Sequence, residues 1–274
     1  MLTSGGRPLR VLVVIPAWNE QASVGSVVRE VRATNPGVDV LVVDDGSGDA
    51  TVRVAREAGA VVCELPFNLG VGGAMRTGYR YAVRHDYDAV VQIDADGQHQ
   101  PSYVGELVEA LADSNIVIGA RFAGSGAYPV RGPRRVAMRV LARVLSRRAR
   151  RPLNDVTRGF RAVDRRAAGI FAMHYPAEYL GDTVESLVIA LRLGCRVTQV
   201  PVEMRMRASG RSTQSTARAT LYLARALVAL GLALVRRWPA VLENPPEVVS
   251  LDPPSVARDT LAPVSRESAT GVVA

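Results

Sequence analysis

The sequence predicts an α/β fold in which a mostly parallel sheet is covered by helices on both faces. Short, continuous apolar runs alternate along the chain with segments of helical periodicity. Strands of that composition are buried on both sides, which is typical of a parallel sheet between helices. Polar loops follow three of the runs, and such sheets bind ligands at the carboxyl ends of their strands. The three loops are therefore expected to converge on one crevice.

The predicted elements alternate along the first half of the chain. Strands are expected at the apolar runs 11–15, 40–43, 60–63, 89–93 and 116–118. Helical periodicity favours helices over 21–33, 50–59, 70–85 and 101–112. Pro101 lies near the start of the last of these helices, where its missing N–H costs little.

Length and charge limit the classes of protein to consider. With 274 residues and 48% hydrophobic content, the chain can bury one core of roughly 200–250 residues. All 34 basic residues are arginine, and with 26 acidic residues they give a net charge of +8, which favours anionic partners. Cys63 and Cys195 form no disulfide or zinc pattern and are expected in the core. The N-terminus lacks the apolar stretch of a signal peptide, so we expect a cytoplasmic chain.

Acidic residues follow two of the predicted strands. Asp44 and Asp45 come after the second run, and Asp94, Asp96 and Gln98 come after the fourth. Oxygen ligands spaced in this way suit Mg²⁺ or Mn²⁺ and leave coordination positions for diphosphate oxygens. The pattern indicates a metal-dependent site for a sugar nucleotide, with solvated turn residues as the alternative.

Four ordered motifs, at 15–20, 42–47, 94–99 and 155–162, resemble those of the family 2 glycosyltransferases. The chain is most similar to the polyprenyl-phosphate sugar synthases of the dolichol-phosphate-mannose synthase type, over about residues 10–213. The resemblance implies a GT-A fold, a nucleotide-diphosphate sugar donor linked to UDP or GDP, a divalent metal and inversion at the anomeric carbon.

By position, the resemblance also implies the donor residues. The nucleotide-sugar set is Pro16, Trp18, Glu20, Asp44, Asp45, Asp94 and Ala95, and the metal set is Asp94, Asp96 and Gln98. Of the first acidic pair, Asp45 is expected to contact the base and Asp44 to support the loop. Trp18 keeps an aromatic face where the family often has Tyr, although it could instead belong to the core. His99 could bind the metal itself or form hydrogen bonds with the residues that do.

The Gly-rich segment 68–74 has two interpretations. It resembles a phosphate-cradling loop, but a single Gly-rich turn is a weak motif. We favour the alternative, in which its glycines let a helix pack tightly behind the donor.

The acceptor side is predicted from charge. Nine arginines lie between positions 131 and 151, at Arg131, Arg134, Arg135, Arg139, Arg143, Arg147, Arg148, Arg150 and Arg151. Four of them recur at i+4 beside an apolar stripe, as in helices that lie on anionic membrane surfaces. A solvated helix face is the alternative, and no recognised nucleic-acid motif accompanies the stripe, so no nucleic-acid partner is expected.

The resemblance implies which residues hold the acceptor phosphate. By position they are Arg121, Arg134, Arg205, Arg207 and Ser212. Met138 stands where relatives carry a Ser, and Thr213 stands where they often carry a Lys, whose charge Arg211 could replace.

The expected chemistry follows from the acceptor. A phosphate monoester is largely dianionic at about pH 7 and needs no protein base. Catalysis then rests on positioning and on neutralising the departing diphosphate. The catalytic set implied by the resemblance is Asp96, Arg121, Asp155 and Arg161, with Asp155 orienting an Arg or the sugar hydroxyls. A sugar-hydroxyl acceptor, the alternative function, would need a carboxylate base, for which Asp182 and Glu185 are the candidates.

The domain prediction divides the chain into four parts. Residues 1–9 are an N-terminal extension, 10–213 the catalytic domain, 214–238 an amphipathic helix on the membrane surface and 239–274 a Pro-rich disordered tail. The uncharged run 226–235 is too short to span a bilayer, and a packed helix of the catalytic domain is the alternative for 214–238.

The expected product is a polyprenyl-phosphate sugar for extracytoplasmic glycan assembly, made by a peripheral enzyme on the inner face of the plasma membrane. A membrane-protein partner would fit this placement. Two other classes of protein fit the sequence less well. A nucleotidyltransferase would carry a basic Gly-rich loop near the first strand, and a basic binding module would not explain the carboxylates.

Overall fold

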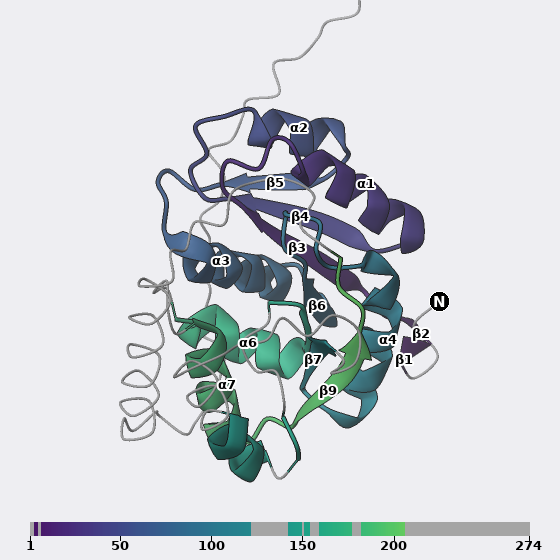
Figure 1. Ribbon diagram of the computed structural model, residues 1–274, viewed down its shortest axis with the longest axis vertical. Helices are drawn as coiled ribbons and strands as arrows, with labels where there is room; N and C mark the ends of the chain where they lie inside the picture. Colours follow the sequence, from purple (N-terminus) through teal and green to yellow (C-terminus); the bar gives the residue numbers. More distant parts are fainter. Residues whose placement is uncertain are drawn as a thin grey trace, which may run out of the picture. The chain divides into compact units, whose positions relative to one another are not determined.

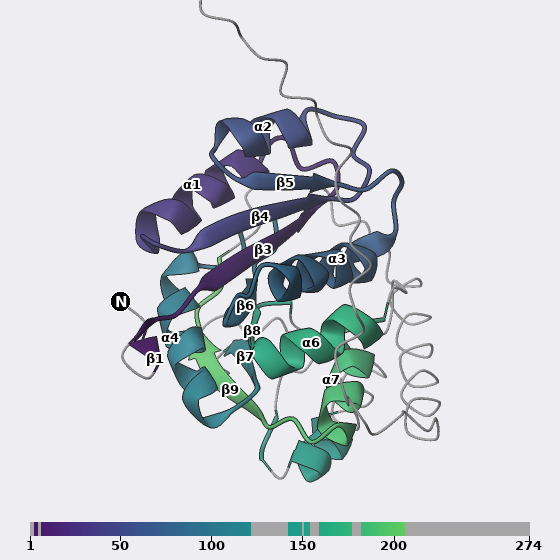
Figure 2. The same cartoon turned by 180° about the vertical axis from the view of Figure 1, so that it is seen from behind.

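The computed structural model describes residues 3–4, 7–121, 142–149, 151–153, 159–176 and 182–205. In this part of the chain, seven strands form one sheet in the order β5-β4-β3-β6-β8-β7-β9, with helices on both faces (Figures 1 and 2). The predicted α/β class is confirmed.

The strands are β1 (Thr3–Ser4), β2 (Arg7–Pro8), β3 (Val11–Ala17), β4 (Asp39–Asp44), β5 (Val61–Glu64), β6 (Ala89–Gln92), β7 (Ile116–Arg121), β8 (Arg161–Asp164) and β9 (Val197–Val202). The helices are α1 (Val24–Thr34), α2 (Thr51–Glu57), α3 (Gly70–Arg84), α4 (Val104–Glu109), α6 (Arg165–His174) and α7 (Asp182–Arg192). Short 3₁₀ turns flank α4, and residues 142–149 are also helical. The five predicted strands agree with the structure to within a few residues.

Two strands of the sheet have no counterpart in the prediction. β8 lies antiparallel between β6 and β7, and β9 pairs parallel with β7. β8 has four residues with a charge at each end, so no apolar run marks it. The ladder of β6 and β8 places Gln92 opposite Arg161, which brings residues 159–161 beside the loop that follows β6.

Alternation along each strand divides the core between the two faces of the sheet. Leu12 and Val14 of β3 face a cluster with α3, α6 and α7, whereas Val13 and Ile15 face a cluster with α1 and α4. Nearly all of these side chains are withdrawn from solvent, and each full burial of this kind stabilises the fold by about 1.5–3 kcal/mol.

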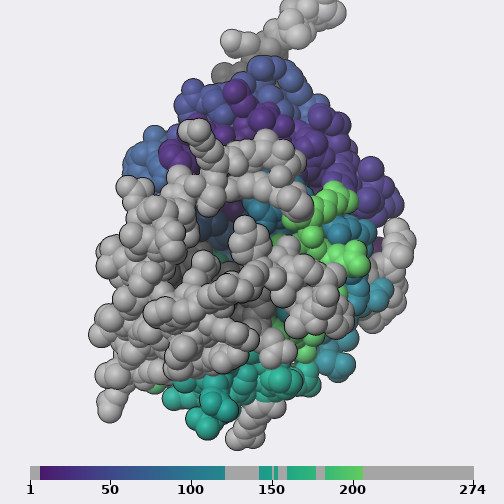
Figure 3. All heavy atoms as spheres, in the orientation of Figure 1, coloured from purple at the N-terminus to yellow at the C-terminus, as the bar shows by residue number. Residues whose placement is uncertain are grey.

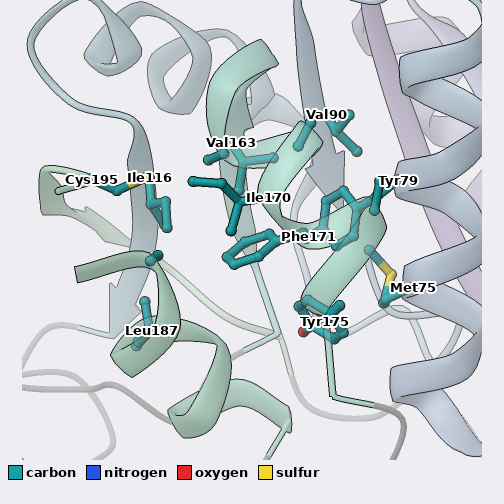
Figure 4. Close-up of a cluster of buried hydrophobic side chains, with 14 of the residues drawn as sticks. Met75, Tyr79, Val90, Ile116, Val163, Ile170, Phe171, Tyr175, Leu187 and Cys195 are labelled. Carbon is teal, nitrogen blue, oxygen red and sulfur yellow. The ribbon is translucent and has the colours of Figure 1, made fainter. Parts of the chain in front are cut away.

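Aromatic packing joins α3 to α6. Tyr79 of α3 lies 5.2 Å from Phe171 and 5.3 Å from Tyr175, which themselves lie 5.2 Å apart between ring centroids (Figure 4). At the end of α6, Arg76 and Arg80 of α3 donate to the carbonyl of Ala172, and Arg76 also reaches Met173. These bonds satisfy carbonyls that the helix end leaves without an intrahelical partner. Side chains of α3 thus fix the position of α6.

Glycine lets α3 approach the sheet closely. A Cβ added to Gly78 would lie 2.5 Å from Cγ1 of Val14, a distance that side chains do not tolerate. This close approach lies one turn beyond the Gly-rich segment 68–74, for which tight packing of a helix behind the donor stays a prediction.

The two cysteines behave as predicted. Cys195 is buried and Cys63 half-buried, and both are free thiols. Burial raises the pKa of Cys195 to about 11 and also raises that of Cys63, so both stay protonated.

Among the residues that the structure describes, no helix has both the length and the apolarity needed to cross a bilayer. The predictions for residues 131–141, 214–238 and 239–274 lie outside the described residues.

Candidate active site

Hydrogen bonds join the two polar loops that follow β3 and β4. The N–H of Asn19 donates to the Ser47 hydroxyl, and the Asn19 side chain accepts from the N–H of Gly48, both at 2.9 Å. The N–H of Glu20 donates to Thr51 at 2.8 Å. Asn19 adopts a φ of 54°, a left-handed conformation that Asn tolerates better than most residues. The convergence predicted for these loops is present.

Asp44 and Asp45 are both buried but have different partners. The Asp45 carboxylate accepts the N–H groups of Leu69 and Gly70, at 2.7 and 2.8 Å, where α3 begins. Burial raises the pKa of Asp45, and these two hydrogen bonds lower it by less. One oxygen of Asp44 accepts the N–H of Ser47 at 3.0 Å, and the other has no hydrogen-bond partner among the described residues.

Both carboxylates thus take part in holding their loop, as was expected of Asp44 alone. Asp45 holds the loop against the start of α3, whereas Asp44 keeps a buried oxygen that can still accept a hydrogen bond. The sequence could not reveal this difference, because the donors to Asp45 lie 24 and 25 residues away. Contact with a nucleobase stays a prediction for both.

The other predicted nucleotide residues lie along the end of β3 and after it. Pro16 is half-buried within β3, and the Glu20 carboxylate accepts from the Ser23 hydroxyl at 2.7 Å. Trp18 is 48% exposed, so the alternative of a core tryptophan is wrong. Phe67 and Leu69, which precede α3, are also large exposed apolar side chains.

The second acidic loop follows β6. Asp94 and Asp96 are both partly exposed, with Ala95 buried between them. The Asp96 carboxylate accepts the N–H of Gln98 at 3.0 Å, which closes the turn. The two carboxylates therefore stay open to solvent at the carboxyl end of a central strand.

His99 lies behind the acidic loop. Its side chain is 2% exposed, its Nδ1 accepts the N–H of Asp94 at 3.0 Å, and its ring stacks on Phe160 with centroids 4.8 Å apart. Of the two interpretations left open for His99, this position favours the hydrogen-bonding neighbour.

Gly159 leaves the space that Asp94 occupies. A Cβ at this position would lie 2.9 Å from Gln92 Nε2 and 3.0 to 3.1 Å from the two oxygens of Asp94. Any larger residue would displace the carboxylate or the amide. The Gly of the motif at 155–162 is thus explained by its proximity to Asp94.

The donor set fits a divalent cation that is shared with a ligand. Within the described ranges, no three His, Cys, Asp or Glu side chains gather as a metal site of their own. Mg²⁺ is commonly held by one or two carboxylates together with waters and substrate phosphates. Asp94 and Asp96 supply two such carboxylates, and the absence of a side chain at Gly159 leaves room for that of Asp94.

The structure places two predicted arginines in contacts that the sequence did not indicate. Arg161 is 1% exposed and donates to the Ser186 hydroxyl of α7 at 3.1 Å. Arg205 donates through its backbone N–H to Gln98 at 2.9 Å, while its guanidinium binds Glu30 of α1. Figure 3 shows the last described part of the chain, which ends at residue 205 and is drawn in green, beside the purple atoms of α1.

Other predicted residues are described only in part. Arg121 is the last residue of β7, Asp182 is the first of α7, and Glu185 is half-buried in α7. Asp155, Arg134, Arg207, Ser212, Met138, Arg211 and Thr213 lie outside the described residues. In the helical segment 142–149, Arg143, Arg147 and Arg148 are exposed and Leu145 is buried.

Sequence reasoning missed Gln92 and Glu30 as members of the site. Gln92 interrupts the apolar run of β6 and is 4% exposed, so a polar residue inside a buried strand was an available signal. Glu30 lies on a helix with other charged residues, and nothing in its neighbourhood distinguishes it.

Comparison with known proteins gives a consistent result. Residues 12–170 match the model of the family described as Glycosyl transferase family 2. The chain is 35% identical over 217 residues to an undecaprenyl-phosphate mannosyltransferase of Micrococcus luteus, covering 76% of this chain and 88% of the relative. It is 30% identical to a polyprenol monophosphomannose synthase of Mycolicibacterium smegmatis, covering 75% and 81%.

A solved structure supports the fold. Glucosyl-3-phosphoglycerate synthase from Mycobacterium tuberculosis, in complex with Mn²⁺, UDP and phosphoglyceric acid, superimposes with a TM-score of 0.64. The identity is 23%, and the match covers 85% of this chain and 81% of that one. At this identity, the likeness concerns the fold alone.

Proposed function

Because the chain belongs to glycosyl transferase family 2, we propose that it transfers a sugar from a nucleoside-diphosphate donor to a polyprenyl phosphate, with inversion at the anomeric carbon. The observation that carries the proposal is that two acidic loops, one with buried carboxylates and one with partly exposed ones, follow β4 and β6, which flank β3 in parallel and so end at the same side of the sheet. The acceptor class is supported by the two relatives, whose names specify polyprenyl phosphates.

The buried loop suits the nucleoside. Asp44 offers a buried oxygen without a partner among the described residues, and a nucleobase N–H would satisfy it. The exposed ring of Trp18 offers an apolar face to the base or ribose. Pro16, Glu20 and Asp45 would shape this part of the site. Uracil and guanine each carry a ring N–H that could donate to this oxygen, so both UDP- and GDP-linked donors fit.

The open loop suits the diphosphate. Asp94, Asp96 and Gln98 would hold Mg²⁺ or Mn²⁺, which supplies positive charge to the departing diphosphate when it is bound. Ala95 lies between the two carboxylates in sequence; its side chain is buried, so its backbone would line the donor. Asp155 would orient an Arg or the sugar hydroxyls, and Arg161 would support the site from beneath.

The transfer itself needs no protein base. A phosphate oxygen of the acceptor attacks the anomeric carbon while the bond from that carbon to the diphosphate breaks. Arg121, Arg134, Arg207 and Ser212 would hold the acceptor phosphate in line for attack. Arg205 is less suited to this role than expected, because Glu30 engages its guanidinium.

We also propose a peripheral position on the inner face of the plasma membrane. In the described part of the 131–151 stripe, Arg143, Arg147 and Arg148 face solvent while Leu145 packs into the core. Near an anionic surface, each arginine contributes about 1 kcal/mol of attraction.

A donor panel tests the proposed reaction. The purified protein is incubated with radiolabelled UDP- and GDP-sugars, Mg²⁺ or Mn²⁺, and undecaprenyl phosphate, and the product is extracted into organic solvent. We expect label in the organic phase only with acceptor and metal. Label that remains water-soluble with every donor, together with transfer to free sugars, would support the hydroxyl-acceptor alternative instead.

Vesicle binding tests the membrane position. A triple variant with Arg143, Arg147 and Arg148 changed to Gln should bind anionic vesicles less strongly than the wild type. The matched control changes three exposed arginines of other helices, Arg29, Arg53 and Arg84, and should bind as the wild type does. Equal losses in both variants would mean that net charge, not this surface, drives binding.

A further inference from the structure

Two buried side chains flank the carboxylate of Asp94. Gln92 Nε2 lies 3.3 Å from Oδ1, and His99 Nε2 lies 3.6 Å from Oδ2. The carboxylate, whose side chain is 39% exposed, therefore has one nitrogen beside each oxygen on its protein side and solvent on the other.

The orientation of His99 follows from its other nitrogen. Because Nδ1 accepts the N–H of Asp94, the neutral imidazole carries its proton on Nε2, which faces the Asp94 carboxylate. The ring has little freedom to turn away. Phe160 stacks on it with 13° between the planes, and residue 99 pairs through its backbone with Met204.

Gln92 presents its amide nitrogen to the other oxygen. The side chain is 4% exposed, and its Oε1 has no hydrogen-bond partner among the described residues. An apolar side chain at position 92 would fill the same space without leaving a buried oxygen unpaired. Packing alone therefore does not explain why a glutamine is present there. Its one polar contact in the described part of the chain is the bond to Asp94.

We propose that Gln92 and His99 are positioning residues that fix the Asp94 carboxylate in the orientation required to bind a divalent cation. Gly159 completes the arrangement, since a Cβ there would occupy the space between Gln92 and Asp94. Residues that form hydrogen bonds with metal-binding side chains commonly tune the affinity for the metal, and their removal lowers that affinity by about 10- to 100-fold. The inference rests on the proposed metal-dependent function.

The test measures Mn²⁺ binding by the full-length protein, alone and with UDP, by electron paramagnetic resonance of free Mn²⁺. Gln92→Met removes the amide at similar volume. His99→Asn can keep the bond to the Asp94 N–H but cannot reach Oδ2, whereas His99→Gln can place an amide nitrogen near the former Nε2. Ser114→Ala is the control, because Ser114 is also buried with an unpaired side-chain oxygen but lies two residues before β7.

We expect Gln92→Met and His99→Asn to weaken Mn²⁺ binding by about 10-fold or more. His99→Gln should recover part of the loss, and Ser114→Ala should match the wild type. The thermal midpoint in EDTA should change little in Gln92→Met, which keeps the side-chain volume, and this separates positioning from general destabilisation.

Two results would overturn the inference in different ways. If the wild type binds Mn²⁺ and both Gln92→Met and His99→Asn bind it equally well, the positioning role is wrong and the proposed function stands. If the wild type binds no Mn²⁺ with or without UDP, the metal-dependent function fails and this inference fails with it.

Discussion

The guanidinium of Arg205 forms a two-pronged ion pair with Glu30, 175 residues earlier in the chain, with both N···O distances at 2.8 Å. The hydrogen bonds with Glu30 raise the pKa of Arg205 further above its ordinary value. Because the backbone of Arg205 also binds Gln98, the pair connects α1 to the second acidic loop.

Paired variants separate two roles for Arg205. If the pair only joins elements of the fold, Arg205→Ala and Glu30→Ala should have equally small effects, since exposed pairs contribute about 0–1 kcal/mol. We expect this result in urea unfolding and in the KM for undecaprenyl phosphate. An acceptor KM that rises in Arg205→Ala but not in Glu30→Ala would instead assign Arg205 to the lipid phosphate.

Removing Asp96 should abolish most of the transfer. Loss of a metal-binding carboxylate removes stabilisation of charge in the transition state, so Asp96→Ala should lower kcat by about 100-fold or more. Initial rates with labelled donor measure the loss, and circular dichroism checks the fold. A rate near that of the wild type, unaffected by EDTA, would rule out the metal assignment.

The two buried aspartates should respond differently to the same substitution. Asp44→Asn replaces an unpaired buried acceptor and should raise the donor KM about 10-fold, with little change in the thermal midpoint. Asp45→Asn can accept only one of the two N–H groups and should lower the free energy of unfolding by about 1–3 kcal/mol. If Asp45→Asn raised the donor KM and Asp44→Asn lowered the stability, the contact with the base would be assigned to Asp45.

Two helix glycines should respond to alanine with opposite signs. Gly78→Ala forces a Cβ against Val14 and should destabilise the protein by roughly 1–3 kcal/mol. Gly169 of α6 has open space around it, so Gly169→Ala should stabilise by about 0.5–1 kcal/mol. Denaturant titration of both variants measures the difference, and a neutral Gly78→Ala would mean that α3 shifts easily on the sheet.

Asp49 should contribute to stability in a pH-dependent way. Burial alone would raise its pKa, but hydrogen bonds from the Thr51 hydroxyl, the Thr51 N–H and the Gln21 N–H lower it overall. A lowered pKa in the folded state stabilises above the ordinary value of 3.8, and this contribution is lost as the pH falls through the folded value. The difference in unfolding free energy between the wild type and Asp49→Asn should therefore shrink in acid; a constant difference would contradict the assignment.

The sequence predicted the parts of the fold that local patterns encode. The runs at 11–15, 40–43 and 89–93 became central strands because an apolar run can be recognised without knowledge of its neighbours. β8 has no such run, and its antiparallel position depends on pairing with β6 and β7. The acidic loops were found for the same local reason, since carboxylates directly follow apolar strands.

The contacts between those loops were not predictable from one sequence. Asp45 is distinguished from Asp44 by its donors at Leu69 and Gly70, and Arg205 is distinguished by its ion pair with Glu30. Such assignments depend on distances across the fold, for which spacing along the chain carries no signal.

The insertion of β8 has a consequence for the order of folding. The ladders among β3, β4, β5 and β6 involve only residues 11–92, so the loops after β3 and β4 can form on a chain that has been synthesised only as far as α3 and β6. The surroundings of Asp94 depend on the ladder from Gln92 to Arg161, which closes a much longer loop and is entropically slower to form. During translation, the loops after β3 and β4 can thus form early, while the surroundings of Asp94 are completed only after residues 159–164 have been synthesised.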